Sequence, residues 1–126
     1  MIGILIVTHG EIGKSLIDCA TNILDDNPIS LDSLSINSNN DLNNYTKIIS
    51  QKIKELDNGD GVLILTDIYG ATPCNLLKNF IVKNKVEVIT GINLPMLIKA
   101  ISDRKDNLNI LLNDSLDCAK KNIKII

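Results

Sequence analysis

The chain contains a single histidine, His9, and its place in the sequence favours a chemical role. His9 follows an apolar run at residues 2–7 and precedes Gly10. An imidazole can form a covalent phosphoryl intermediate through an unprotonated ring nitrogen. The ordinary imidazole pKa of about 6.5 leaves much of such a side chain neutral near pH 7. His9 is therefore the candidate nucleophile and phosphoryl acceptor.

Asp67 is the second candidate catalytic residue, because a carboxylate can orient an imidazole. It directly follows the apolar stretch at residues 61–66. A carboxylate that accepts a hydrogen bond from one ring nitrogen fixes the tautomer and leaves the lone pair of the other nitrogen exposed. It also stabilises the positive charge that develops on attack. A phosphorus–nitrogen bond is labile, so the predicted adduct is a relay intermediate.

A short segment of small residues after Asp67 is the candidate phosphate-binding turn: Gly70, Ala71 and Thr72, followed by Pro73. Backbone N–H groups and a hydroxyl at the start of a helix suit an anion. We expect Thr72 to be the N-cap and Pro73 the first helical residue. Gly10 is expected to leave room for an incoming phosphoryl donor.

The hydrophobic pattern predicts the elements that position these side chains. Four segments are predicted strands: residues 2–7, 29–36 (an edge strand), 61–66 and 86–90. Five segments are predicted helices: residues 13–26, 42–56, 72–82, 94–102 and 108–119. Strands and helices therefore alternate along the chain.

This alternation predicts an α/β fold, a three-layer α/β/α sandwich with a mostly parallel central sheet. Right-handed crossovers favour the strand order 2-1-3-4, and residues 123–126 are a candidate short C-terminal strand. In such a sheet, ligands bind outside the carboxyl ends of the strands where the order reverses. His9 and Asp67 end the first and third predicted strands. We therefore predict that their side chains touch.

Length and composition exclude several classes of function. A chain of 126 residues predicts one domain over residues 1–126. The net charge of −2 and the scarcity of aromatic residues argue against binding to nucleic acid. No apolar run is long enough to span a bilayer. The chain has neither a second histidine nor an acidic pair after the first strand, so we expect no metal site and no cofactor.

Three cysteines are scattered along the chain without any Cys-x-x-Cys spacing: Cys19, Cys74 and Cys118. An odd number without metal-binding spacing favours reduced thiols. The sequence therefore predicts a cytoplasmic location.

Three motifs occur in a specific order along the chain. They are Thr8-His9-Gly10, residues 65–75 (LTDIYGATPCN) and residues 91–97 (GINLPML). This set resembles the mannose-type (mannose/fructose/sorbose) enzyme IIA component of the bacterial phosphoenolpyruvate-dependent sugar phosphotransferase system. The similarity runs in register from residue 1 to about residue 103, and the remaining residues match poorly.

The resemblance implies a phosphotransferase that serves carbohydrate uptake or its regulation. It implies that His9 receives phosphoryl from the phosphocarrier HPr and delivers it to an enzyme IIB. It also implies that Asp67 hydrogen-bonds the imidazole, that the Thr72 turn receives the phosphoryl oxygens, and that the chain is a homodimer. Two positions depart from the family pattern: Ala71 stands where a second glycine is frequent, and Cys74 where a larger apolar residue often lies.

Alternative interpretations remain at this stage. A P-loop nucleotide-binding domain is suggested by Gly13-Lys14-Ser15 after a strand, but Thr8 stands where the motif requires glycine. Three further alternatives are a receiver-type domain phosphorylated on Asp67, a flavodoxin-like FMN binder and a non-catalytic regulatory interaction domain.

Apolar residues near the predicted site have two possible roles. Ile68 and Tyr69 are candidates for a docking patch for another protein. Leu94 and Met96 are candidates for the same patch or for the core.

Overall fold

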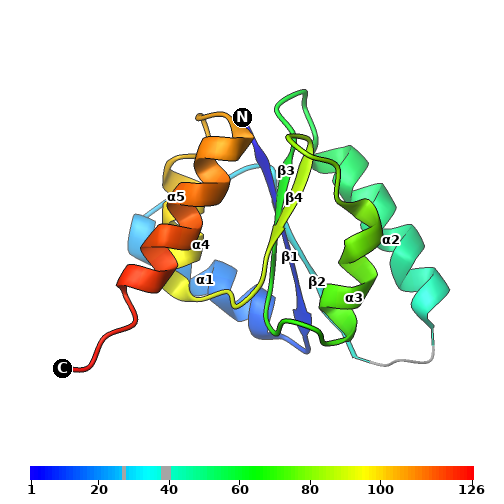
Figure 1. Cartoon of the computed structure of the whole chain (residues 1–126), viewed down its shortest axis with the longest axis horizontal. Helices are drawn as coiled ribbons and strands as arrows, with labels where there is room; N and C mark the ends of the chain where they lie inside the picture. Colours follow the sequence, from blue (N-terminus) through cyan, green and yellow to red (C-terminus); the bar gives the residue numbers. More distant parts are fainter. Residues whose placement is uncertain (27, 38–40) are drawn as a thin grey trace.

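The computed structural model describes residues 1–26, 28–37 and 41–126, and their elements follow the predicted order (Figure 1). The strands are β1 (Gly3–His9), β2 (Leu31–Ile36), β3 (Val62–Thr66) and β4 (Val86–Ile89). The α-helices are α1 (Ile12–Leu24), α2 (Leu42–Leu56), α3 (Thr72–Leu77), α4 (Leu94–Ser102) and α5 (Leu108–Lys121). A 3₁₀ turn, η1 (Lys78–Phe80), follows α3.

The four strands form one parallel sheet in the order β2-β1-β3-β4, which confirms the predicted topology. In this register Val7 of β1 lies opposite Thr66 of β3, and His9 lies opposite Ile36 of β2. The carboxyl ends of β1 and β3 are therefore neighbours, at the bottom of the sheet in Figure 1.

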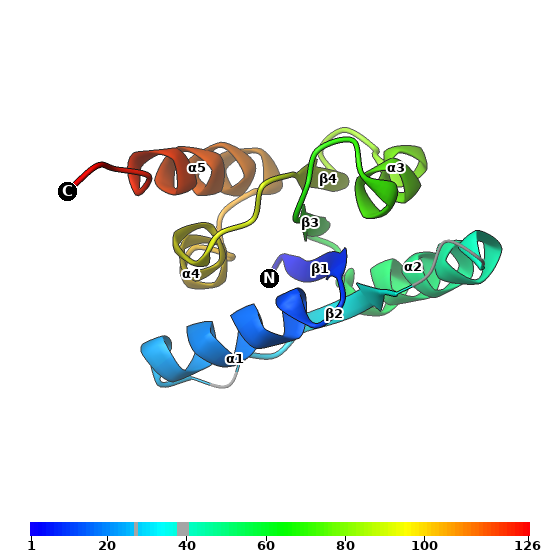
Figure 2. The same ribbon diagram turned by 90° about the horizontal axis from the view of Figure 1, so that it is seen from below.

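Helices cover both faces of the sheet. Figure 2 shows α1, α4 and α5 on one side of the row of strands and α2 and α3 on the other. Side chains alternate between the faces along a strand, so Ile4 and Ile6 pack in the first layer and Leu5 and Val7 in the second. Burial of each such side chain contributes about 1.5–3 kcal/mol. Continuous burial explains why the central strands are apolar at successive positions.

Arg104 closes the opposite end of the sheet from His9, a role that its charged sequence neighbours do not indicate. The residue is buried, and its guanidinium donates hydrogen bonds to the backbone carbonyls of Ile2, Ile29 and Ser30. Burial lowers the pKa of Arg104, and the charge of Asp26 opposes that shift. The side chain therefore connects the start of β1 to the segment that leads into β2.

The third helix is shorter than predicted. We expected it to reach residue 82, but α3 ends at Leu77 and Ile81 already has extended backbone. Val82 and Val86 exchange backbone hydrogen bonds of 3.0 and 2.8 Å in an isolated antiparallel bridge. The chain must leave the helix before residue 82 to form this bridge.

Residues 123–126 extend away from the body of the molecule after α5 (Figure 1). They carry no regular secondary structure, so the candidate C-terminal strand does not form in this chain, and Ile125 and Ile126 are fully exposed. Within the described ranges, no helix has the length and apolar character needed to cross a membrane.

Candidate active site

His9 and Asp67 are in contact at the carboxyl end of the sheet, as the topology predicted. The ring Nδ1 of His9 lies 2.7 Å from Oδ2 of Asp67, and the backbone N–H of His9 donates to the same oxygen at 3.0 Å. The Asp67 side chain is only 10% exposed, whereas the His9 side chain is 45% exposed. The carboxylate is therefore shielded while the imidazole remains accessible to a reactant.

The environment of Asp67 keeps its carboxyl group ionised. Burial is the largest single influence and would raise the pKa of Asp67. Hydrogen bonds from the His9 backbone, the His9 ring and the Ile68 N–H together outweigh burial, so the pKa is lowered. An ionised carboxylate only accepts hydrogen bonds, so Nδ1 of His9 must carry the proton. In the neutral ring, the free lone pair is then on Nε2.

Thr8 fixes the start of α1 next to the site. The residue is fully buried, and its Oγ1 accepts a hydrogen bond from the N–H of Gly13 at 2.9 Å. Only Gly10 and Glu11 separate β1 from α1. Thr8 is one of two polar residues in an otherwise apolar strand, a signal in the sequence that marks this anchor.

This geometry contradicts the P-loop interpretation. Residues 13–15, which resembled the end of a P-loop motif, lie inside α1. A two-residue connection between strand and helix is too short for the glycine-rich loop that surrounds a nucleotide phosphate.

Gly10 is required by backbone conformation. Its φ is +48°, in the left-handed region that other residues rarely adopt. No heavy atom lies within 4 Å of the position that a Cβ would occupy there. Within the chain itself, the constraint at Gly10 is therefore conformational, and crowding plays no part.

The candidate phosphate-binding turn lies beside this pair, with one correction. Ala71 is the N-cap of α3 and Thr72 is already helical, so Thr72 is not the predicted cap. Gly70 takes a φ of +81°, which lets the chain turn one residue earlier. Because α3 has only six residues, its dipole is weaker than the sequence suggested.

Two backbone donors of the turn remain available. The N–H of Ala71 donates to the carbonyl of Ile68 at 3.3 Å. In the part of the chain that the structure describes, the N–H groups of Gly70 and Thr72 have no protein acceptor. These two groups, with the hydroxyl of Thr72, are the donors that the turn could offer to an anion.

The apolar residues around the site divide into two groups. Ile68 and Tyr69 are 58% and 79% exposed at the rim. Met96 is buried in the core and Leu94 packs against it, which confirms the core interpretation for both. The three cysteines are unpaired thiols, as predicted.

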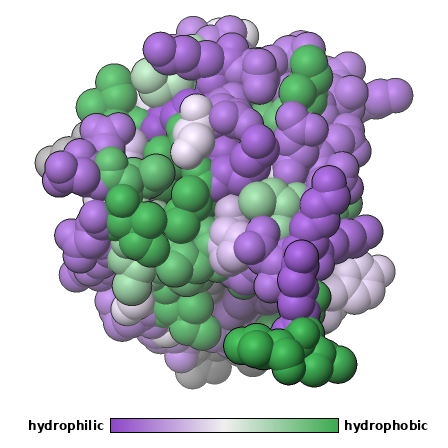
Figure 3. Space-filling view, turned by 90° about the vertical axis from the view of Figure 1, so that its left-hand side faces the viewer, coloured by the Kyte–Doolittle hydropathy of each residue, from purple (hydrophilic) through white to green (hydrophobic). Residues whose placement is uncertain are grey.

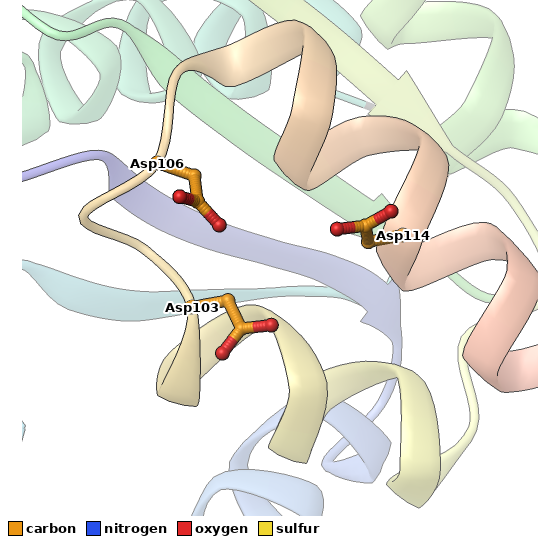
Figure 4. A group of neighbouring side chains, drawn as sticks. All are labelled: Asp103, Asp106 and Asp114. Atoms are coloured by element: carbon orange, nitrogen blue, oxygen red, sulfur yellow. The ribbon is translucent and has the colours of Figure 1, made fainter.

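An acidic cluster lies at the other end of the sheet. Figure 4 shows Asp103, Asp106 and Asp114 pointing toward one another from the end of α4, the following loop and α5. One carboxylate oxygen from each lies within 4.8 Å of the others. Lys99 Nζ pairs with Asp103 Oδ2 at 2.6 Å, so a cation of the chain already neutralises part of this charge.

Known proteins match the chain over most of its length. The family model EIIA-man, described as the PTS system fructose IIA component, matches residues 3–114. The mannose-specific EIIAB component of the phosphotransferase system of Escherichia coli (strain K12) is 29% identical over 107 residues, which are 84% of this chain and 33% of that protein. The chain thus spans about a third of the length of that relative. The fructose-specific EIIA component of Bacillus subtilis (strain 168) is 37% identical over 67 residues, 48% of this chain and 46% of that protein.

Solved structures share the fold. The phosphotransferase system component EIIA from Streptococcus agalactiae superposes with a TM-score of 0.86 at 22% identity, covering 99% of this chain and 97% of that one. The mannose/sorbose specific IIA subunit from Enterococcus faecalis gives a TM-score of 0.85 at 20% identity, covering 99% and 94%. At these identities the likeness shows the fold alone. Because the family model covers nearly all of the sequence, the chain belongs to the EIIA-man family of the phosphotransferase system.

Proposed function

We propose that this chain is a phosphotransferase that carries a phosphoryl group on His9 within the sugar phosphotransferase system. The observation that supports this most strongly is the 2.7 Å contact between Nδ1 of His9 and Oδ2 of Asp67 beside an accessible ring. Phospho-HPr is the proposed donor and an enzyme IIB the proposed acceptor. The carrier would serve carbohydrate uptake or its regulation.

The proposed transfer begins at Nε2 of His9. Its lone pair attacks phosphorus and forms a phosphorus–nitrogen bond, while the bond from phosphorus to the donor breaks and its electron pair goes to the donor atom. The ring acquires positive charge, which the adjacent Asp67 carboxylate stabilises through the Nδ1–H hydrogen bond. Delivery to enzyme IIB reverses these steps, with the ring nitrogen as leaving group. No proton needs to leave Nδ1 in either direction.

The phosphoryl oxygens are proposed to bind the turn at Gly70, Ala71 and Thr72. The unused N–H groups of Gly70 and Thr72 and the Thr72 hydroxyl support this assignment. Charge-assisted hydrogen bonds to such oxygens are stronger than neutral ones. The carrier needs only moderate stabilisation, because it must release the group.

We further propose that residues 1–126 act as one enzyme IIA domain in the cytoplasm and that the chain forms a homodimer. Two features support the dimer: the exposed apolar tail at residues 123–126 and the outer edge of β4, which pairs with no further strand in the described sheet. Figure 3 shows hydrophobic side chains gathered on part of the face that carries α1, α4 and α5, with the hydrophobic tail at its lower edge. An extended tail can add to the exposed sheet edge of a second copy.

Sedimentation of the purified chain tests the dimer. A variant truncated after Lys121 should sediment as a monomer, because it lacks the tail. Leu42→Asp, a matched change to an exposed apolar residue on the other side of the sheet, should remain dimeric. A full-length chain that is monomeric at micromolar concentration would contradict the proposal.

Phosphoryl acceptance is tested with purified components. The chain is incubated with phosphoenolpyruvate, enzyme I and HPr, and the added phosphoryl is counted by mass spectrometry. One group per chain is expected, and its loss in acid but not in alkali identifies phosphohistidine. An adduct stable in acid but labile in alkali would place the group on a hydroxyl, and one labile in both would place it on a carboxylate such as Asp67.

A further inference from the structure

Two buried hydroxyl groups have no hydrogen-bond partner among the described residues, and one of them lies at the active site. These are Oγ1 of Thr66 and Oγ of Ser115. Both residues are fully buried. A buried donor without an acceptor costs free energy, so such groups are rare in folded proteins. The Thr66 hydroxyl therefore calls for an explanation.

Thr66 lies on β3, the strand next to that of His9, and is level with Val7. It is the last residue of β3, immediately before Asp67, and it pairs with Val7, two residues before His9. Side chains alternate along a strand. Leu5 and Val7 pack on the face covered by α2 and α3, so His9 lies on that face.

The same alternation places Thr66 on this face too, because Val62 and Ile64 pack there. Its backbone is held in place: the Thr66 carbonyl accepts the N–H of Ile92 at 3.0 Å. The register places the Thr66 side chain on the strand next to His9 and level with Val7, two residues before His9. With the backbone held, only the side-chain torsion of Thr66 remains adjustable.

We propose that the Thr66 hydroxyl is a hydrogen-bond donor for the phosphoryl group on His9; this deepens the proposed function and rests on it. A phosphoryl group brings three strong acceptor oxygens. The N–H groups of Gly70 and Thr72, which have no acceptor among the described residues, and the Thr72 hydroxyl provide three donors, and Thr66 provides a fourth. The acceptor that Thr66 lacks in the unphosphorylated chain arrives with the phosphoryl group.

The proposal requires a small movement. Thr66 is inaccessible in the unphosphorylated chain, so the group reaches it only if neighbouring residues shift. Residues 68–70, which follow Asp67, are exposed, and no heavy atom lies within 4 Å of the position that a Cβ would occupy at Gly70. This segment has the room to move.

Removing the hydroxyl should affect the two states of the chain differently. Thr66→Val keeps the branched shape and deletes the O–H. In the unphosphorylated chain this removes a group without a partner, which is neutral or stabilising. In the phosphorylated chain it removes a hydrogen bond to a charged acceptor. Ser115→Ala deletes the other partnerless hydroxyl, on α5, and serves as the matched control.

The experiment equilibrates each variant with phospho-HPr and measures the phosphorylated fraction, the hydrolysis rate of the adduct and its ³¹P chemical shift. We expect Thr66→Val to lower the equilibrium constant for phosphorylation about tenfold and to change the ³¹P shift. Ser115→Ala should match the wild type, and Thr66→Ser should restore it. Thr66→Ala, which deletes the same hydroxyl in a smaller side chain, provides a second measurement if the valine variant folds poorly.

The outcomes separate the two proposals. Equal equilibrium constants and ³¹P shifts for Thr66→Val and Ser115→Ala would overturn the role of Thr66 and leave the proposed carrier function intact. A wild-type chain that takes no phosphoryl group would instead overturn the carrier function itself, and the role of Thr66 with it.

Discussion

The carboxylate of Asp67 binds two nitrogens of one residue: Oδ2 lies 3.0 Å from the backbone nitrogen of His9 and 2.7 Å from its ring Nδ1. The backbone contact holds the end of β1 against the end of β3, and the ring contact fixes the direction of the imidazole. Both depend on β1 and β3 being neighbours in the sheet. The strand order therefore sets the orientation of the imidazole of His9.

Replacing Asp67 with asparagine should slow phosphoryl transfer from phospho-HPr about 100-fold, because a neutral amide cannot stabilise the charge that develops on the ring. The rate is measured by rapid quench. Asp103→Asn, a carboxylate at the far end of the sheet, should transfer at the wild-type rate. A rate for Asp67→Asn within threefold of wild type would show that the carboxylate is not needed.

The lowered pKa of Asp67 also predicts how stability depends on pH. A carboxyl group whose pKa is lower in the folded chain than its unfolded value of about 3.9 stabilises the fold above that value. This contribution is lost as the pH falls through the folded-state pKa. The unfolding free energy of the wild type should therefore approach that of Asp67→Asn as the pH falls below about 4. Urea titrations at each pH measure it, and a constant difference would contradict the prediction.

Two variants of Gly10 distinguish a requirement for left-handed backbone from a requirement for space beside His9. Gly10→Ala should cost about 1 kcal/mol of unfolding free energy, because a left-handed φ is unfavourable for alanine. Gly10→Asn should cost less, since asparagine tolerates this conformation. We expect the asparagine variant to transfer phosphoryl at nearly the wild-type rate. A folded but inactive asparagine variant would instead support crowding of the donor.

Arg104 should matter for stability and not for chemistry. Arg104→Met removes the guanidinium from three backbone carbonyls, of which only that of Ser30 keeps another donor in the described part of the chain, the N–H of Ile4, and should cost about 2–4 kcal/mol in urea unfolding. Lys105→Met, an exposed neighbour, should change stability by less than about 0.5 kcal/mol. Transfer by folded Arg104→Met should match the wild type, because Arg104 lies at the opposite end of the sheet from His9. Equal stability of the two variants would contradict the structural role.

The sequence predicted the sheet and the contact between His9 and Asp67, because both follow from strong local signals. Continuous apolar runs identified the buried strands, and their alternation with helices left few topologies open. Once the order was 2-1-3-4, the ends of the strands before His9 and Asp67 had to be neighbours. The contact between His9 and Asp67 follows from the strand order, and no short sequence motif predicts it.

Other features depend on contacts that a sequence pattern does not contain. The early end of α3 follows from the bridge between Val82 and Val86. Arg104 lies in a charged segment that is typical of an exposed turn. Its side chain is nevertheless buried, because it donates hydrogen bonds to carbonyls distant in the sequence. The missing partner of Thr66 is visible only once every neighbouring acceptor has been placed.

Phosphorylation of His9→Ala with phosphoenolpyruvate, enzyme I and HPr tests the central claim most directly. The wild type should gain one phosphoryl group per chain, and His9→Ala, shown to be folded by circular dichroism, should gain none. A folded His9→Ala variant that still takes up a phosphoryl group from HPr would contradict the assignment of His9 as the acceptor.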